Sequence, residues 1–302
     1  MSHGVSSQTY DTWVYAAALA GLPLQTPRRL RQLIDAGDPC DVWSRVTSGN
    51  AVIARLDQNV VAAWATYGNR ELEEMYRRCC ANDMDVVVRG MASYPDVFLT
   101  DPAAPAVFFT RGDVSVLSQR RVGIIGTRHA TRAGARMAFT LGAQLSSANV
   151  AVVSGLARGI DVQAHAGVFS LQDLAAPPVA VVASGVDVVY PPEHHSIWNR
   201  IATDGLVLSE SPPGTEPAPH RFPLRNRIIA SLSEVLVVVE SGHKGGSMIT
   251  VREAMKRDVT VMAVPGSPQL RQSEGTTALL RDGCAPVGDV TDILVALGLD
   301  TR

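Results

Sequence analysis

The chain has 302 residues and the composition of an ordinary globular protein, with 46% apolar and 19% charged residues. Since a single hydrophobic core stops growing near about 250–300 residues, this length favours one large domain and a smaller one. The net charge of −2 argues against a binder whose whole surface is cationic, and the aromatic content of 5% provides few rings on which bases stack. A local basic cleft remains compatible with these values.

The sequence carries no sign of secretion or of a membrane segment. Its first ten residues lack the basic start and apolar stretch of a signal peptide, and no stretch approaches about 18 uninterrupted apolar residues. The cysteines show no C-x-x-C spacing. They are Cys40, Cys79, Cys80 and Cys284. We therefore expect a soluble cytoplasmic protein with free thiols, no membrane contact, no metal and no cofactor.

Residues 1–82 form the first predicted domain, which is helical. Residues 12–20 are an apolar run, and Thr26-Pro27 and Asp38-Pro39 are typical helix starts. The pattern predicts a small bundle of helix–turn–helix pairs. Three arginines of its second helix either contact a phosphate backbone or face solvent, and the solvated face is the favoured interpretation. They are Arg28, Arg29 and Arg31.

Residues 83–302 form the second predicted domain, an α/β domain with a doubly wound, mostly parallel sheet. A short strand at 85–88 and a proline-rich stretch precede a covering or edge element at 107–109. From Arg121 onward, short strands alternate with helical segments, as in a parallel sheet with helices on both faces. The predicted strands are runs of Val, Ile and Leu, as burial on both faces requires. They are 122–125, 150–153, 179–183, 206–209, 235–240 and 259–264.

Three glycine-containing turns follow strands of this sheet: 126–132, 154–161 and 242–247. Parallel strands bring such turns to one sheet edge, and each turn combines backbone amides and a hydroxyl at a helix start with a cation. Glycine is also the default residue of a tight turn, so one loop alone carries little weight. Three together predict a row of phosphate sites. The surrounding region is mildly basic, with 13 Lys and Arg against 11 Asp and Glu between Arg121 and Thr260.

One segment concentrates positive charge beside an aromatic ring. The stretch from His220 to Arg227 holds three arginines, a histidine and Phe222, with no acidic residue between Glu216 and Glu234. Guanidinium groups beside a ring suit a nucleic-acid single strand, because they bind phosphates while a base stacks on the ring. The alternative is a helix start whose arginines pair with carboxylates elsewhere in the fold.

Recognised catalytic motifs are mostly absent from the sequence. It lacks G-x-x-x-x-G-K-[ST], and no strand–turn matches G-x-G-x-x-G or G-x-S-x-G. Asp161 and His165, four residues apart, are interpreted as a structural hydrogen-bonded pair rather than an acid–base pair. Glu240, at a strand end, leaves open a nucleoside monophosphate hydrolase in which it is the base. We expect no enzymatic activity, with this hydrolase as the alternative.

Several of these segments together resemble the DNA-processing protein A family, also called Smf. The shared motifs, in chain order, are Gly126-Thr127-Arg128, residues 154–161 with Ala164-His165, Tyr190-Pro191, residues 209–214, residues 222–229 and Pro265-Gly266-Ser267. The resemblance runs from about residue 85 to residue 297. It implies an extended Rossmann-like domain that binds single-stranded DNA and loads RecA recombinase onto it during natural transformation. It also implies a homodimer and a sterile-alpha-motif-like domain in the helical N-terminal part.

Mapped through these motifs, the resemblance implies a DNA-binding set in the turns and the basic segment. The set is Thr127, Arg128, Ser154, Gly155, Arg158, His220, Arg221, Phe222, Arg225, Asn226, Arg227, Lys244, Gly245, Gly246 and Ser247. The chain departs from the family pattern at Gly245, at Asp258-Val259 and at Thr277, and each change alters a polar contact. We expect no winged-helix module after Leu297. Nucleotide sensing in defence is a further alternative on the same fold.

Overall fold

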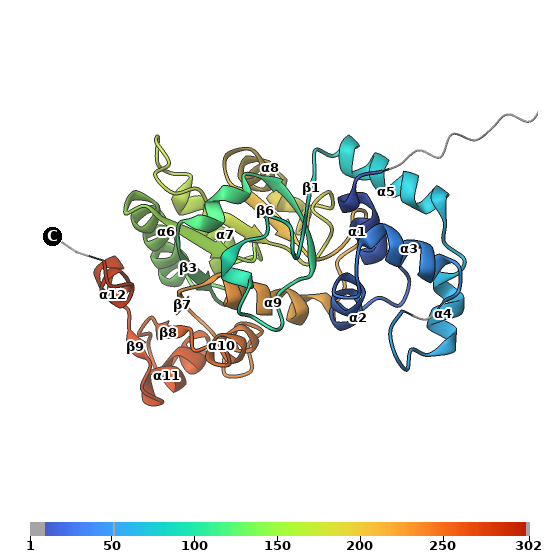
Figure 1. Cartoon of the computed structure of the whole chain (residues 1–302). Helices are drawn as coiled ribbons and strands as arrows, with labels where there is room; N and C mark the ends of the chain where they lie inside the picture. Colours follow the sequence, from blue (N-terminus) through green and yellow to red (C-terminus); the bar gives the residue numbers. More distant parts are fainter. Residues whose placement is uncertain (1–9, 51, 300–302) are drawn as a thin grey trace, which may run out of the picture. The chain divides into compact units, whose positions relative to one another are not determined.

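The computed structural model describes residues 10–50 and 52–299, which fall into two compact units (Figure 1). The first unit comprises Met1–Tyr94 and Pro105–Phe109, and the second comprises Pro95–Ala104 and Thr110–Arg302. Strand β2 (Val107–Gly112) therefore begins in the first unit and ends in the second.

The first unit is a helical bundle followed by strand β1 (Asp85–Val88). Its helices are α1 (Thr12–Ala20), α2 (Pro27–Ile34), α3 (Pro39–Thr47), α4 (Gln58–Trp64) and α5 (Asn69–Ala81). The apolar α1 packs against α3 and α5. The predicted helix starts are confirmed: Thr26 accepts a hydrogen bond from the Arg29 amide at 3.2 Å, and Asp38 accepts one from the Cys40 amide at 2.9 Å. Among the α2 arginines, Arg29 donates to the Leu24 carbonyl.

The second unit contains a parallel sheet with the strand order β6-β5-β4-β3-β7-β8-β9. The strands are β3 (Arg120–Ile125), β4 (Val150–Ser154), β5 (Val179–Val181), β6 (Leu206–Ser209), β7 (Val235–Val238), β8 (Thr260–Ala263) and β9 (Ala285–Pro286). The six predicted strands are confirmed to within two residues at each end. In register, Val122 of β3 lies opposite Val152 of β4 and Val235 of β7.

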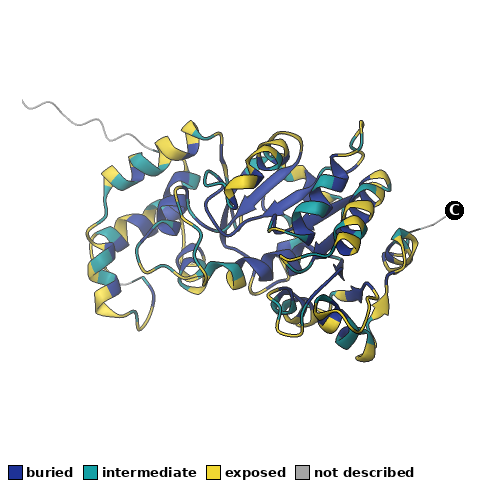
Figure 2. Ribbon diagram, turned by 180° about the vertical axis from the view of Figure 1, so that it is seen from behind, coloured by how far each residue is buried: buried dark blue, intermediate teal, exposed yellow. Residues whose placement is uncertain are grey.

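Helices cover both faces of this sheet, which explains why its strands are apolar throughout (Figure 2). On one face, α6 (Arg132–Ser147), α7 (Ile160–Val168) and α12 (Val290–Ala296) pack on alternate strand residues such as Val122 and Val152. The other face is covered by α9 (Arg221–Leu232) with α10 (Ser247–Met255) beside it. The remaining elements of this unit are α8 (His195–Asp204), α11 (Glu274–Arg281), η1 (Asp96–Phe98), η2 (Val114–Ser118), η3 (Pro192–His194) and η4 (Arg271–Ser273).

The path of the chain through the sheet confirms a doubly wound fold. From β3 it proceeds outward through β4 and β5 to β6, then returns to β7 on the other side of β3. The strand order reverses between β3 and β7. In open α/β sheets, ligands bind outside the carboxyl ends of the strands, near such a reversal. Within the described residues, no helix has the length and apolar character needed to cross a membrane.

Candidate nucleic-acid interface

A pocket lies over the carboxyl ends of β3, β4 and β5, wholly within the second unit. The empty space within it, which includes open solvent, is about 360 Å³. The lining residues are Arg128, Gly155, Ala157, Arg158, Val182, Ala183, Ser184, Tyr190, Pro191, Phe222 and Arg225. Five of the residues predicted to bind DNA therefore meet at one pocket. They are Arg128, Gly155, Arg158, Phe222 and Arg225.

Two aromatic rings and one cation form a cluster at this pocket. The rings of Tyr190 and Phe222 have centroids 5.9 Å apart and are tilted by 56°. The exposed Arg128 places its guanidinium carbon 5.0 Å from the centroid of the Phe222 ring. This cation–π contact holds the cation beside the ring. Sequence reasoning omitted Tyr190 from the site, although Tyr190-Pro191 follows β5 and so lies at the same sheet edge as the predicted turns.

Arg225 forms the buried floor of the pocket. Its side chain is embedded, with 7% of the residue exposed, and Nη1 donates to the carbonyls of Gly155 at 2.7 Å and Val181 at 2.6 Å. A side chain at Gly155 would overlap this guanidinium, so any larger residue there requires Arg225 to move. Desolvation lowers the pKa of Arg225 to about 10, and the nearby Asp161 carboxylate opposes that effect. The floor therefore keeps its positive charge at neutral pH.

The loop after β4 is fixed by contacts within the second unit. The hydroxyl of Ser154 is fully buried and donates to the Ile124 carbonyl at 2.6 Å. Leu156 adopts a left-handed backbone with φ of 52°, and its carbonyl accepts a hydrogen bond from Nδ1 of His194 at 3.0 Å. At Gly159, φ is 78° and a side chain would overlap the Thr127 carbonyl. Ser154 therefore positions the loop from inside rather than from the pocket surface.

The predicted row of helix-start anion sites is only partly realised. At the start of α6, the Glu240 carboxylate accepts hydrogen bonds from the Thr131 amide at 2.9 Å and from the Thr131 hydroxyl at 2.5 Å. A side chain at Gly134 would overlap the same carboxylate. Because a protein carboxylate already occupies this positive helix end, the first turn does not provide the predicted phosphate site there. At the start of α7, the Ile160 amide donates to the Thr127 carbonyl at 3.3 Å.

The third glycine turn, after β7, does not line the pocket. Its Ser247 is buried and donates a hydrogen bond to the Ser241 hydroxyl at 2.8 Å, while Gly245 is half-buried. Asn226 of α9 donates to the Gly246 carbonyl at 3.4 Å, which ties this turn to the helix that carries Phe222 and Arg225. Lys244 and Gly246 are exposed. The turn is thus a separate surface beside the pocket.

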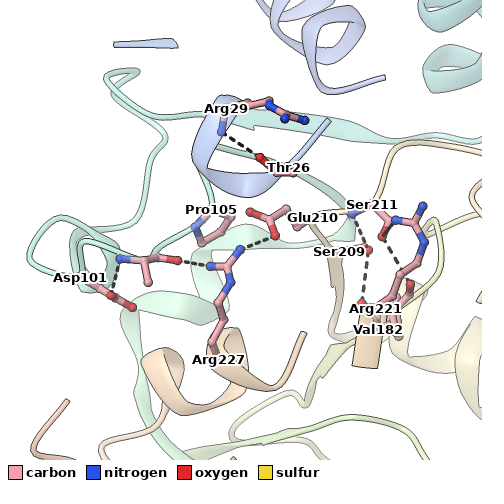
Figure 3. A network of polar contacts seen from close by, with 12 residues as sticks. Thr26, Arg29, Asp101, Pro105, Val182, Ser209, Glu210, Ser211, Arg221 and Arg227 are labelled. Carbon is pink, nitrogen blue, oxygen red and sulfur yellow. Dashed lines mark hydrogen bonds and ion pairs between the residues drawn. The ribbon is translucent and has the colours of Figure 1, made fainter. Parts of the chain in front are cut away.

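Arg227 does not line the pocket and is buried in an ion pair with Glu210 (Figure 3). It contacts the Glu210 carboxylate and donates to the Ala103 carbonyl, and the two charged side chains are 10% and 14% exposed. For this residue, the pairing with a carboxylate elsewhere in the fold is the correct interpretation of the basic segment. Desolvation raises the pKa of Glu210, and Arg227 opposes that rise.

Serine hydroxyls at the end of β6 and just after it support the pocket wall formed by residues 182–184 (Figure 3). Ser209 donates to the Ser184 carbonyl at 2.6 Å, and Ser211 donates to the Ala183 carbonyl at 3.4 Å. Arg221 donates to the Ser211 hydroxyl at 3.4 Å. Arg221 therefore acts on the pocket through this network, whereas His220, just before α9, is exposed. Sequence reasoning did not assign a supporting role to either serine.

The predicted hydrogen bond between Asp161 and His165 is wrong. Both ring nitrogens of the fully buried His165 lack a hydrogen-bond partner, and desolvation lowers its pKa to about 3. Asp161 instead accepts from the Ala157 amide at 3.4 Å, within the turn that precedes α7. The carboxylate is directed to the loop, so it stabilises the pocket edge and not the histidine.

Known proteins resemble this chain in both sequence and structure. Protein Smf of Synechocystis is 34% identical over 209 residues, covering 68% of this chain and 52% of the relative. The DNA processing protein DprA of Bacillus subtilis is 37% identical over 194 residues, covering 64% of each protein. The aligned regions thus span between half and two thirds of these relatives' length.

Two solved structures have the same fold. DNA processing protein A of Streptococcus pneumoniae matches with a TM-score of 0.80 at 25% identity, covering 97% of this chain and all of that one. The Helicobacter pylori protein, described for its unique single-stranded DNA binding mode, matches with a TM-score of 0.62 at 29% identity, covering 71% of this chain and 95% of that one. Residues 85–298 match the DNA recombination-mediator protein A family, and the chain belongs to that family.

Proposed function

We propose that this chain binds single-stranded DNA in the pocket over β3, β4 and β5. The observation that supports this most strongly is the meeting of three arginines and two aromatic rings at one pocket. They are Arg128, Arg158, Arg225, Tyr190 and Phe222. Guanidinium groups bind phosphates, and aromatic rings stack on bases. In a duplex the bases are stacked inside the helix and are not accessible to such rings. The combination suits a strand whose bases are free.

The charge on the pocket arginines predicts binding that depends strongly on salt. Arg128 and Arg158 are exposed at the pocket, and Arg225 adds a fixed charge at its floor. Each phosphate neutralised on a single strand changes the logarithm of the affinity by about 0.7 per tenfold change in salt. The pocket offers two rings on which any base can stack, so sequence preference is expected to be slight.

The role we propose for the bound strand is delivery to a RecA recombinase during natural transformation, by a cytoplasmic homodimer. Family membership supports recombination mediation, and the single-stranded DNA binding described for the Helicobacter pylori relative supports the ligand. The test adds the protein to single-stranded DNA covered by a single-strand-binding protein and measures RecA filament formation. Stimulation by the native chain and its loss in Arg128→Ala support delivery, and equal filament growth without the chain contradicts it. Light scattering in the absence of DNA tests the dimer.

We propose that the protein binds DNA and does not hydrolyse nucleotides. Glu240, the candidate base, is 7% exposed and hydrogen-bonded to Thr131 at the start of α6. A carboxylate held in this way lacks the free access to a substrate proton that a general base requires. Ribose release measured over a panel of nucleoside monophosphates tests this assignment. Turnover that disappears in Glu240→Gln contradicts it.

The binding experiment compares oligo-dT, a duplex and an RNA of equal length by fluorescence anisotropy. We expect tightest binding to single-stranded DNA and a weaker, less salt-dependent interaction in Arg128→Ala. The matched control is Arg281→Ala, which removes the same charge from an exposed position on α11 outside the pocket. A preference for duplex, or equal losses in the two variants, contradicts the proposal.

A further inference from the structure

A carboxylate lies at the rim of the pocket, on one of its cations. Glu193 of η3 forms an ion pair with Nε of Arg158, and the two side chains are 49% and 48% exposed. Among the described residues, Arg158 is the pocket arginine with a carboxylate within 4 Å, since Arg225 is bonded to carbonyls and Arg128 lies over a ring. One of the three pocket cations is therefore occupied by a group of the protein itself.

The position of Glu193 relative to Arg158 is fixed by two connections. Glu193 follows Pro192 and the pocket residues Tyr190 and Pro191 directly in the chain. The next residue, His194, is 9% exposed, and its Nδ1 donates at 3.0 Å to Leu156, on the loop that also carries Arg158. The hydrogen bond anchors η3 to that loop.

We propose that Glu193 competes with a DNA phosphate for Arg158 and so limits the affinity of the pocket for single-stranded DNA. This inference rests on the proposed function. A phosphate that binds Arg158 must displace the carboxylate or share the guanidinium with it, and in both cases two negative charges lie close together. The ion pair with Arg158 holds the pKa of Glu193 below its ordinary value, so the carboxylate is charged at neutral pH.

The competition has a consequence for the class of ligand. Inorganic phosphate that reaches Arg158 meets the carboxylate and has no base to stack on the two rings. A strand gains contacts at Arg128, Arg225 and the two rings at the same time, and these contacts offset the displacement. Glu193 therefore favours single strands over inorganic phosphate.

The test measures oligo-dT affinity and its salt dependence for Glu193→Gln, for Arg158→Ala and for the double variant. We expect Glu193→Gln to bind about threefold more tightly at low salt and to have a salt slope that is steeper by up to about 0.7, because Arg158 becomes free for one more phosphate. Arg158→Ala binds more weakly than the native chain. In the double variant, less than half of the gain from Glu193→Gln remains, since its target is absent.

The matched control is Asp204→Asn, which removes an exposed carboxylate 3.6 Å from Arg200 on α8, outside the pocket. It is expected to bind like the native chain. Native-like or weaker binding by Glu193→Gln, with its urea midpoint unchanged, overturns the inference, and so does an equal gain in the control. If the native chain binds and Arg158→Ala weakens it while Glu193→Gln gives no gain, the inference alone fails. Absence of native binding removes the proposed function as well.

Discussion

Replacing Arg227 separates a buried structural arginine from the arginines of the pocket. In Arg227→Met, the carboxylate of Glu210 loses its ion-pair partner while it remains 14% exposed, and the Ala103 carbonyl loses its hydrogen bond. Removing one partner of a buried pair costs about 3–5 kcal/mol in the free energy of unfolding, because the other charge stays desolvated. With a typical urea dependence of about 1–3 kcal/mol per molar, the midpoint falls by about 1 M or more.

The loss of stability in Arg227→Met depends on pH in a direction that the structure fixes. Desolvation already raises the pKa of Glu210, and Arg227 opposes this rise, so the variant raises that pKa further. The folded variant then binds more protons than the unfolded chain above the ordinary Glu pKa, and its stability falls as pH rises through that window. The deficit relative to the native chain is therefore larger at about pH 8 than at about pH 5.5.

The assay is urea unfolding of the native chain, Arg227→Met and the double variant Arg227→Met/Glu210→Gln at both pH values. The double variant removes both charges and is expected to recover most of the lost stability. A native-like midpoint in Arg227→Met, or a deficit that shrinks as pH rises, refutes the buried-pair account. So does a variant that keeps full stability and loses only its salt-dependent DNA binding, because that result places Arg227 in the pocket.

Three further variants test other parts of the structure. Arg128→Ala is expected to lower the salt slope for oligo-dT binding by about 0.7 with an unchanged urea midpoint, since its side chain is exposed; a shifted midpoint contradicts the assignment. Gly155→Ala is expected to weaken both stability and oligo-dT binding, because a methyl group overlaps the Arg225 guanidinium, and native values in both assays count against that packing. Glu240→Gln is expected to lose about 0.5–2 kcal/mol of stability in urea unfolding, because its contacts with Thr131 weaken, and to keep DNA binding. Lost DNA binding with full stability would contradict the structural role of Glu240.

The strands could be predicted because each is a local run of apolar residues. The pairing of the strands could be predicted only in part. The alternation of strands and helices indicated a parallel sheet, and a doubly wound order followed from that pattern. The neighbours of β3 depend on where the chain reverses after β6, which is a long-range property. Such contacts leave little trace in the local pattern of residues.

The limits of the site prediction are clearest on α9. The sequence presents Arg225 and Arg227 as one basic patch. Two residues along a helix, however, turn the side-chain direction by about 200°. Arg225 therefore lines the pocket while Arg227 contacts Glu210. Helical periodicity alone indicates that the two point apart. Only the fold shows that Arg227 pairs with Glu210, a carboxylate 17 residues earlier in the chain.

The carboxylates were harder to predict than the cations. Glu240 stands at a strand end, where a catalytic role is plausible from sequence, and its partner Thr131 lies 109 residues away in the chain. Glu193 lies 35 residues from Arg158. Charges at strand ends identify a candidate site, but whether a cation there is free or already paired depends on contacts between separate loops.

The most direct test of the central claim is photocrosslinking of the native chain to a single strand that carries a photoreactive thymine analogue, followed by mass spectrometry of the crosslinked peptides. If the strand occupies the pocket over β3, β4 and β5, the crosslinks map to Tyr190 and Phe222, whose rings lie 5.9 Å apart there. Excess unlabelled single strand removes them. Crosslinks that map instead to α2 of the helical unit, with none in the peptides that contain Tyr190 or Phe222, contradict the claim.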